Sequence, residues 1–166
     1  TVKKLIMSQT KGNVYPFWYI SNANEDFAVD TKGTAHSKSK PDFAREIGIS
    51  TDGTVWVLSN IPDPDGGGAK IFWGNGDNKW NEIGTSDPGG MTIAGAGAAQ
   101  CIYKTSSGRI YSLKTDGTAV KSYEDMGILR IASGGKYVWA LMPESQGEKP
   151  VLRFIDVTDA SAKWKT

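Results

Sequence analysis

Short runs of aromatic and β-branched residues alternate with clusters of Gly, Asp, Asn, Ser and Pro along the whole chain. This pattern predicts short β-strands bounded by turns. No stretch keeps apolar positions at helical spacing without an interrupting Gly or Pro, so no helix is predicted. Sixteen strands are predicted, over 4–8, 17–21, 27–30, 35–39, 45–50, 54–59, 69–73, 80–84, 91–95, 101–105, 109–114, 119–123, 129–133, 137–142, 151–157 and 162–165.

Three segments recur later in the chain at nearly the same separation, 83 or 84 residues. They are Thr31-Lys-Gly-Thr-Ala35 with Thr115-Asp-Gly-Thr-Ala119, Val55-Trp-Val-Leu58 with Val138-Trp-Ala-Leu141, and Lys79-Trp80 with Lys163-Trp164. A shared separation is typical of an internal repeat. The chain is therefore predicted to consist of two homologous halves.

Each half also divides into two similar groups of four strands. Ile102-Tyr103 and Ile110-Tyr111 fall where the next group has Val138-Trp139 and Arg153-Phe154. A repeat of about 42 residues with four strands has the size of one propeller blade, which buries its faces against its neighbours in a ring.

We therefore predict an all-β fold: a small β-propeller of four four-stranded blades, arranged as two homologous halves in a single domain over 1–166. The blades are expected near 1–40, 41–87, 88–126 and 127–166. A β-sandwich with a duplicated hairpin is the alternative, because sandwiches also have short, evenly spaced strands.

Some residues are expected to serve packing alone. Trp56 and Trp139 lie in apolar strands and are expected between blades, and Cys101 is expected to be buried as a small hydrophobe. The segment Gly95–Ala99 lacks the lysine and the following helix of a phosphate-binding loop. It is expected instead to let backbones approach closely near the ring centre.

Charge and cysteine content restrict the partners. The 19 Lys and Arg nearly balance 18 Asp and Glu, and no basic cluster is present, so nucleic acid is not predicted as a partner. No apolar stretch is long enough for membrane insertion. A single cysteine excludes an intramolecular disulfide, which slightly favours a cytoplasmic location over secretion without disulfides.

Catalytic chemistry finds no support in the sequence. The one histidine, His36, lies in a polar run and is expected to be solvated. Without a second His, a Cys cluster or a Glu pair at ligand spacing, no metal, cofactor or catalytic triad is predicted. An enzyme would need convergent carboxylates with perturbed pKa values, for which the acids to inspect are Asp26, Asp30, Asp52 and Asp116. We expect no enzyme activity.

A family resemblance covers part of the chain. Ile47–Ser59, with its Asp52-Gly-Thr-Val-Trp56 turn and strand, followed by Lys70–Trp73 and Lys79–Gly84, resembles a tectonin repeat. Residues 43–84 match well and 128–166 moderately, whereas 1–40 and 88–125 match in outline. The resemblance implies a lectin-like recognition protein of innate defence that binds cell-surface sugars, such as those of bacteria. Familiar members of the family have more than four blades.

Candidate sugar-binding residues surround two turns. Trp73 and Trp80 bracket a polar turn, and sugar recognition commonly combines a flat ring with a few polar side chains. A plain hairpin turn is the alternative. The equivalent turn of the second half keeps acids but loses glycines, so equal affinity is not expected. The predicted binding residues are Trp73, Asn75, Asp77, Asn78, Trp80, Asp156, Asp159 and Trp164.

The predicted function is carbohydrate binding through repeated sites, in which multivalency raises avidity. The alternative is a protein–protein interaction propeller that binds no glycan, which would carry a large exposed apolar patch. The sequence leaves open whether the ring closes within one chain or through a homo-oligomer.

Overall fold

The computed structural model describes residues 2–7, 15–38, 44–62, 69–75, 79–83, 90–105, 110–123, 127–128, 130–143, 149–159 and 161–166. Over these residues the chain is all β, with no helix. The strands are β1 (Val2–Met7), β2 (Phe17–Ser21), β3 (Asp26–Val29), β4 (Ala35–Lys38), β5 (Ala44–Ile49), β6 (Val55–Pro62), β7 (Ala69–Gly74), β8 (Asn81–Ile83), β9 (Gly90–Ala96), β10 (Gln100–Thr105), β11 (Ile110–Lys114), β12 (Ala119–Tyr123), β13 (Arg130–Gly134), β14 (Tyr137–Met142) and β15 (Val151–Asp156).

Fifteen of the sixteen predicted strands coincide with these elements, with ends displaced by a few residues. The last one, predicted over 162–165, forms only a single antiparallel bridge between Lys165 and Phe154 of β15.

The strands form four antiparallel sheets in which chain neighbours pair with each other. The first sheet is β1–β4, the second β5–β8, the third β9–β12 and the fourth β13–β15. The second and third sheets are also joined by one residue pair, Ala69 with Gly90.

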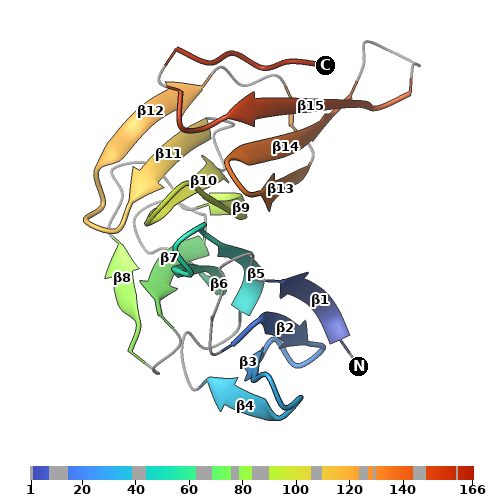
Figure 1. Cartoon of the computed structure of the whole chain (residues 1–166), viewed down its shortest axis with the longest axis vertical. Coiled ribbons are helices and arrows are strands. Elements are labelled where there is room, and N and C mark those ends of the chain that lie inside the picture. The colour runs from blue at the N-terminus through green and yellow to red at the C-terminus, as the bar shows by residue number, and fades with distance from the viewer. Residues whose placement is uncertain are drawn as a thin grey trace.

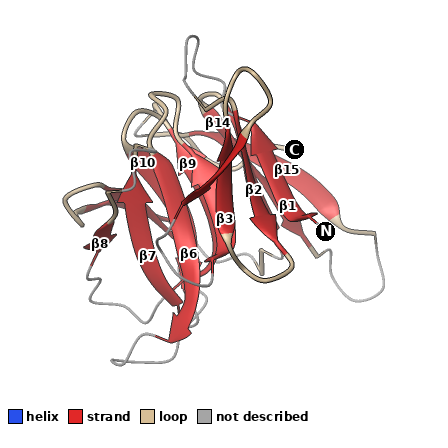
Figure 2. Cartoon of the chain, turned by 90° about the horizontal axis from the view of Figure 1, so that it is seen from below, coloured by secondary structure: helices blue, strands red, loops and turns tan. Residues whose placement is uncertain are grey.

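The four sheets are arranged as a fan (Figure 1). Their first strands, β1, β5, β9 and β13, lie at the inner side of the fan, whereas β4, β8 and β12 lie at its outer side (Figure 1). Viewed from below, the sheets stand next to one another (Figure 2). The fan is open between the first and fourth sheets in Figure 1, and no closed ring is detected among the described residues, so the ring of four blades stays a prediction.

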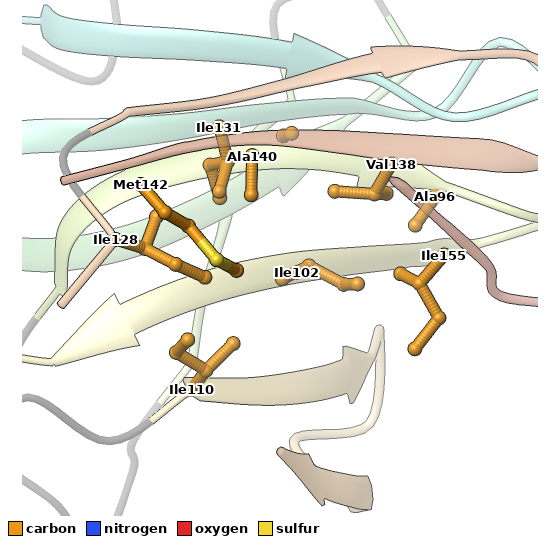
Figure 3. Packing of buried hydrophobic residues seen from close by; sticks show 10 residues of the cluster. Ala96, Ile102, Ile110, Ile128, Ile131, Val138, Ala140, Met142 and Ile155 are labelled. Carbon is orange, nitrogen blue, oxygen red and sulfur yellow. The ribbon is translucent and has the colours of Figure 1, made fainter. Parts of the chain in front are cut away.

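Alternate residues of a strand point to opposite faces of its sheet, so one sheet can pack apolar side chains against a neighbour on each side. Three apolar clusters hold consecutive sheets together in this way. Between the first and second sheets lie Trp18, Ile20, Ala28, Ala44, Ile47, Ile49, Val55 and Val57. Between the second and third lie Trp56, Leu58, Ile71, Ile83, Ile93, Cys101, Tyr103 and Leu113. Between the third and fourth lie Ala94, Ala96, Ile102, Ile110, Ile128, Ile131, Val138, Ala140, Met142 and Ile155 (Figure 3).

Hydrogen bonds add to the apolar contact between the second and third sheets. The buried Trp56 Nε1 donates to Ser50 Oγ at 2.7 Å, and Ser50 Oγ donates in turn to the carbonyl oxygen of Gln100. The backbone N–H of Thr51 donates to the carbonyl of Gly97 at 2.7 Å. Cys101 is fully buried at this interface, as predicted, and burial raises the pKa of its thiol.

The inner strands β5 and β9 approach each other very closely at two glycines. A Cβ on Gly95 would lie 2.1 Å from the carbonyl carbon of Ile49, and a Cβ on Gly48 would lie 2.4 Å from the nitrogen of Gly95. The close approach expected at Gly95–Ala99 is therefore confirmed at Gly95.

The repeated segments occupy equivalent places in the sheets. Gly33 in the β3–β4 turn and Gly117 in the β11–β12 turn have φ values of 84° and 83°, and each donates its N–H to the carbonyl three residues earlier at 3.0 Å. Trp56 and Trp139 both lie on the second strand of a sheet. The structure thus relates the first sheet to the third and the second sheet to the fourth.

The prediction of two packed tryptophans is only half correct. Trp56 is 0% exposed, whereas Trp139 is 36% exposed. Trp139 lies on the face of the fourth sheet that points away from the third, and no sheet formed by the described residues covers this face. Tryptophan at equivalent positions is therefore fully buried in the second sheet and partly exposed in the fourth, which is the last sheet of the fan.

We expect Trp56→Ala to lower the free energy of unfolding by about 3–5 kcal/mol, because it removes a fully buried indole and leaves a cavity. Since the second–third interface also loses the bond to Ser50, the upper part of this range is expected. Trp139→Ala in dilute protein should cost about 1 kcal/mol or less. Urea titrations followed by circular dichroism measure both, and equal losses would contradict the packing described.

We expect Gly95→Ala to destabilise the fold by about 1–3 kcal/mol, because its Cβ collides with backbone atoms and must separate β5 from β9. Gly33→Asn is the matched control: no atom lies within 4 Å of its added Cβ, and Asn tolerates the positive φ of this turn. Thermal unfolding should show a lower midpoint for the first variant and little change for the second.

Candidate functional site

The two tryptophans of the first predicted site lie on opposite faces of the second sheet. Trp73, in β7, pairs with Trp56 and packs with the cluster toward the third sheet. Trp80 packs with the cluster toward the first sheet. Its ring lies close to Gly74, where an added Cβ would be 3.1 Å from Trp80 Cε3. The two rings therefore do not form one pocket.

The polar members of this predicted site are placed only in part. Asn75 follows β7 and is exposed. Asp77 and Asn78 lie outside the described residues. Of the predicted polar turn between two rings, the described structure therefore shows Trp73 on one face of the second sheet, Trp80 on the other face, and Asn75 exposed after β7.

In the turn after β15, both predicted acids are engaged in local hydrogen bonds. Asp156 accepts from the Thr158 backbone and hydroxyl and forms a 2.7 Å ion pair with Lys136. Asp159 accepts from the Ser161 N–H at 2.8 Å and hydroxyl at 2.7 Å. Trp164 packs against the cluster between the third and fourth sheets. These acids stabilise a turn, and the ring beside them is a packing residue.

A row of aromatic side chains begins at Trp80, at the border of the first and second sheets. The ring centroid of Trp80 lies 6.1 Å from that of Trp18, Trp18 lies 6.2 Å from Tyr15, and Tyr15 lies 5.7 Å from His36. All three pairs are edge-to-face. We call Tyr15, Trp18, His36 and Trp80 the aromatic cluster. Trp18 is buried, and the other three rings are partly exposed.

An ionised carboxylate lies next to this cluster. Asp30 Oδ2 accepts from His36 Nε2 at 3.0 Å, so His36 is not the isolated, solvated residue expected from the sequence. Asp30 Oδ1 accepts from the N–H groups of Lys32 and Thr34, each at 2.9 Å. The bond from His36, followed by that from Thr34, lowers the pKa of Asp30. Asp30 is therefore ionised at neutral pH and only accepts hydrogen bonds.

Two buried donors of the aromatic cluster have no hydrogen-bond partner among the residues that the structure describes. They are the indole N–H groups of Trp18 and Trp80. An unsatisfied buried donor costs about 1–3 kcal/mol, and most buried polar groups in proteins are paired. The rings of the aromatic cluster therefore pack against one another, while two of their buried indole N–H groups lack an acceptor among the described residues.

A small pocket lies at the inner side of the fan, between the four first strands. It has a volume of about 170 Å³ and is lined by Lys4, Leu5, Ile6, Ile47, Ile93, Ala94, Ile131, Ala132 and Ser133. Small-molecule sites usually enclose about 300–1,000 Å³. This pocket is below that size and mostly apolar, so it does not resemble a site for a sugar or a cofactor.

Beside this pocket, Glu46 of β5 connects three sheets. It forms a 3.5 Å ion pair with Lys4 of β1, and it accepts from the hydroxyl of Thr92 at 2.7 Å and from the N–H of Ile93 at 3.2 Å, both in β9. The only carboxylate seen at the inner strands in the described structure thus serves to join sheets.

Three of the acids considered for catalysis, Asp30, Asp52 and Asp116, lie in three separate turns of the described structure. Asp30 and Asp116 each belong to a turn between a third and a fourth strand, and the N–H of Thr118 is the main cause of the lowered pKa of Asp116. Asp52 accepts from the N–H of Thr54 in the β5–β6 turn. No group of three or more His, Cys, Asp or Glu that could hold a metal ion is found among the described residues.

Tyr15 was not among the site residues predicted from the sequence, and Asp30 was named only as an acid to inspect for catalysis. Trp80 comes from the second sheet and meets this row through Trp18 of the first sheet, so the packing between the sheets brings it there. The observed register explains why Trp73 and Trp80 separate: Asn81 pairs with Trp73, so alternation places Trp80 and Trp73 on opposite faces of the second sheet.

Comparison with known proteins supports the architecture. No family model and no curated protein matches the chain. Solved structures do, with a TM-score of 0.60 for the tricorn protease at 12% identity and 0.60 for U3-55K at 8% identity. The extracellular domain of the putative one component system BT4673 from B. thetaiotaomicron follows with a TM-score of 0.54 at 16% identity.

These matches cover 96%, 99% and 96% of this chain, but only 16%, 51% and 24% of the three longer chains. The neighbours are β-propeller-like proteins. The arrangement of sheets is therefore propeller-like, whereas the comparisons do not select the tectonin family. No helix in the described part of the chain is long and apolar enough to span a membrane.

The Asp156–Lys136 pair predicts a pH dependence. Hydrogen bonding to Lys136, then to Thr158, lowers the pKa of Asp156 from 3.8 to about 2. Because the folded-state pKa lies below the unfolded one, this contribution to stability is present above about pH 4 and is lost as the pH falls through about 2.

We expect Asp156→Asn to reduce the loss of unfolding midpoint between pH 4 and pH 2, without abolishing it, since the pKa of Asp30 and of Asp116 is also lowered. In Lys136→Met, the carboxyl of Asp156 should titrate closer to its ordinary pKa. Carboxyl NMR titration measures this directly. A pKa of Asp156 that is ordinary in the unsubstituted chain would contradict the pairing.

Proposed function

We propose that this chain is a carbohydrate-recognition protein of the tectonin-like propeller type, and that it binds a cell-surface sugar at the aromatic cluster. The observation that carries the proposal is the row of edge-to-face rings that runs from Trp80 through the buried Trp18 to Tyr15 and His36 and ends at the ionised Asp30. A sugar presents apolar C–H faces and hydroxyl groups. Rings and a carboxylate side by side complement both.

Polar complementarity supports the same location. The carboxylate of Asp30 accepts hydrogen bonds from donors, including sugar hydroxyls, and the His36 ring holds one of its oxygens. The accessible polar groups of the cluster include this carboxylate and the His36 ring, without a net excess of positive charge, which suits a neutral ligand better than a phosphate.

The duplicated half does not preserve this group of side chains. At a separation of 84 residues, Tyr15, Trp18, Asp30 and His36 correspond to Ala99, Ile102, Lys114 and Val120. Only Trp80 keeps a counterpart, Trp164. We therefore propose one sugar site per chain, which replaces the expectation of repeated sites in the two halves.

A glycan array followed by calorimetry tests the proposal. We expect a stoichiometry of one sugar per chain, and a decrease in affinity of about tenfold or more for Tyr15→Ala and for His36→Ala. Circular dichroism confirms that each variant is folded.

Trp80→Phe and Trp164→Phe form the matched pair, since both residues pack against the preceding sheet at equivalent positions. Affinity should decrease only in the first. Equal affinity in all folded variants would exclude the aromatic cluster as the site, and a folded chain that binds no glycan would refute the sugar-binding function.

A second candidate function is supported by a separate observation. The first and fourth sheets each have one face that no neighbouring sheet of the described structure covers. These faces carry large exposed apolar side chains, among them Leu5, which is 63% exposed, and Leu152, which is 55% exposed. Exposed apolar surface of this kind is typical of protein interaction sites. A protein-interaction propeller without glycan binding would form a stable protein complex and give no response on the array.

A further inference from the structure

The fourth sheet has an uncovered apolar face. Trp139 of β14 lies opposite Phe154 of β15, and Leu141 lies opposite Leu152. The ring centroids of Trp139 and Phe154 are 5.0 Å apart. These four residues alternate with those that pack against the third sheet, so they point away from the rest of the chain. We call them the trailing face.

The first sheet has an uncovered apolar face as well. Leu5 of β1, Tyr19 of β2 and Phe27 of β3 lie opposite one another across the sheet. The rings of Tyr19 and Phe27 are stacked, with centroids 4.8 Å apart and planes 9° from parallel. Next to them lie Met7 and Phe17, which are also exposed. These five residues are the leading face.

The internal duplication shows which residues of the second sheet correspond to the trailing face. In the second sheet, the positions equivalent to Trp139 and Leu141 are Trp56 and Leu58. They lie opposite Trp73 and Ile71, as Trp139 and Leu141 lie opposite Phe154 and Leu152. In the second sheet these residues pack against the third sheet and are covered by it.

In the same way, the duplication shows which residues of the third sheet correspond to the leading face. Tyr103 and Tyr111 of the third sheet lie 84 residues after Tyr19 and Phe27 and are likewise stacked, with centroids 5.6 Å apart. Tyr103 is buried against the second sheet, and Tyr111 packs beside it. The two uncovered faces are therefore the counterparts of the two faces that form the second–third interface.

We propose that a second copy of this chain covers both faces. The fourth sheet of each copy packs on the first sheet of the other, so that two equal head-to-tail interfaces close a ring of eight sheets. A second copy is the occupant that the structure specifies, because each face has its complement on the same chain and the interface continues the one between the second and third sheets. Head-to-tail contacts generate a closed ring when the rotation between copies allows closure.

The shape of the chain agrees with this assembly. The fan is open on the side where the first and fourth sheets end, and the chain spans 51% of the length of the propeller-like U3-55K chain. In the ring, the pocket lined by the four first strands faces its counterpart in the other copy and becomes part of a central channel. This assembly is independent of sugar binding at the aromatic cluster, which lies between the first and second sheets.

Sedimentation velocity of the full chain over a range of concentrations tests the proposal. We expect a species of twice the 17.9 kDa chain mass that dissociates on dilution. Trp139→Glu and Tyr19→Glu, one on each face, should each weaken the dimer about tenfold or more, because they bury a charge in the interface. Lys32→Asp, on an exposed turn, is the control and should leave association unchanged.

Mixing the two variants distinguishes the head-to-tail arrangement from a face-to-face one. A mixed pair retains one interface with two unsubstituted faces, so the mixture should associate more strongly than either variant alone. A dimer formed by two trailing faces would be insensitive to Tyr19→Glu and would not be restored by mixing.

Circular dichroism and the thermal midpoint in dilute solution check the fold of each variant. If a variant fails to fold, Leu152→Glu and Leu5→Glu replace the pair, since these are more exposed positions of the two faces. A chain that remains monomeric at all concentrations, or a dimer that neither substitution weakens, would overturn the proposal.

Discussion

The structure depends on the burial of both faces of each inner sheet. The second and third sheets carry apolar residues on both sides of their strands, and neither could be stable in water alone. Burial of apolar area contributes about 25 cal/mol per Å², so stacking sheet on sheet supplies the main driving force of the fold. The place of the second and third sheets then follows, because each of these two can bury both faces only by lying between two others.

Polar groups fix the spacing and register that apolar contact alone would leave loose. Trp56, Ser50 and Gln100 form a hydrogen-bonded chain across the second–third interface, and Glu46 connects β1, β5 and β9. Gly48 and Gly95 allow the inner strands to meet at backbone distance. The inner side of the fan is thus held rigidly, while the sheets diverge toward their outer strands, as expected for propeller-like packing.

Local patterns were sufficient to predict the strands and the duplication, because alternation and turn residues act within a few positions. The turns containing Gly33 and Gly117 show this, since the same short sequence produces the same φ and the same hydrogen bond in both halves. The pairing of Trp73 with Trp80 failed because proximity in sequence says nothing about the face of a sheet. Trp80 meets Trp18 through contact between two sheets, and the exposure of Trp139 depends on its place in the last sheet of the fan, so neither could be read from a local pattern.

The single cysteine gives the molecule a built-in reporter. Cys101 is completely buried between the second and third sheets, and no other thiol competes with it for a reagent. A thiol-specific probe can reach its sulfur only when these sheets separate. The rate of labelling in native buffer therefore measures how often the middle of the fan opens, independently of whether its outer faces are covered.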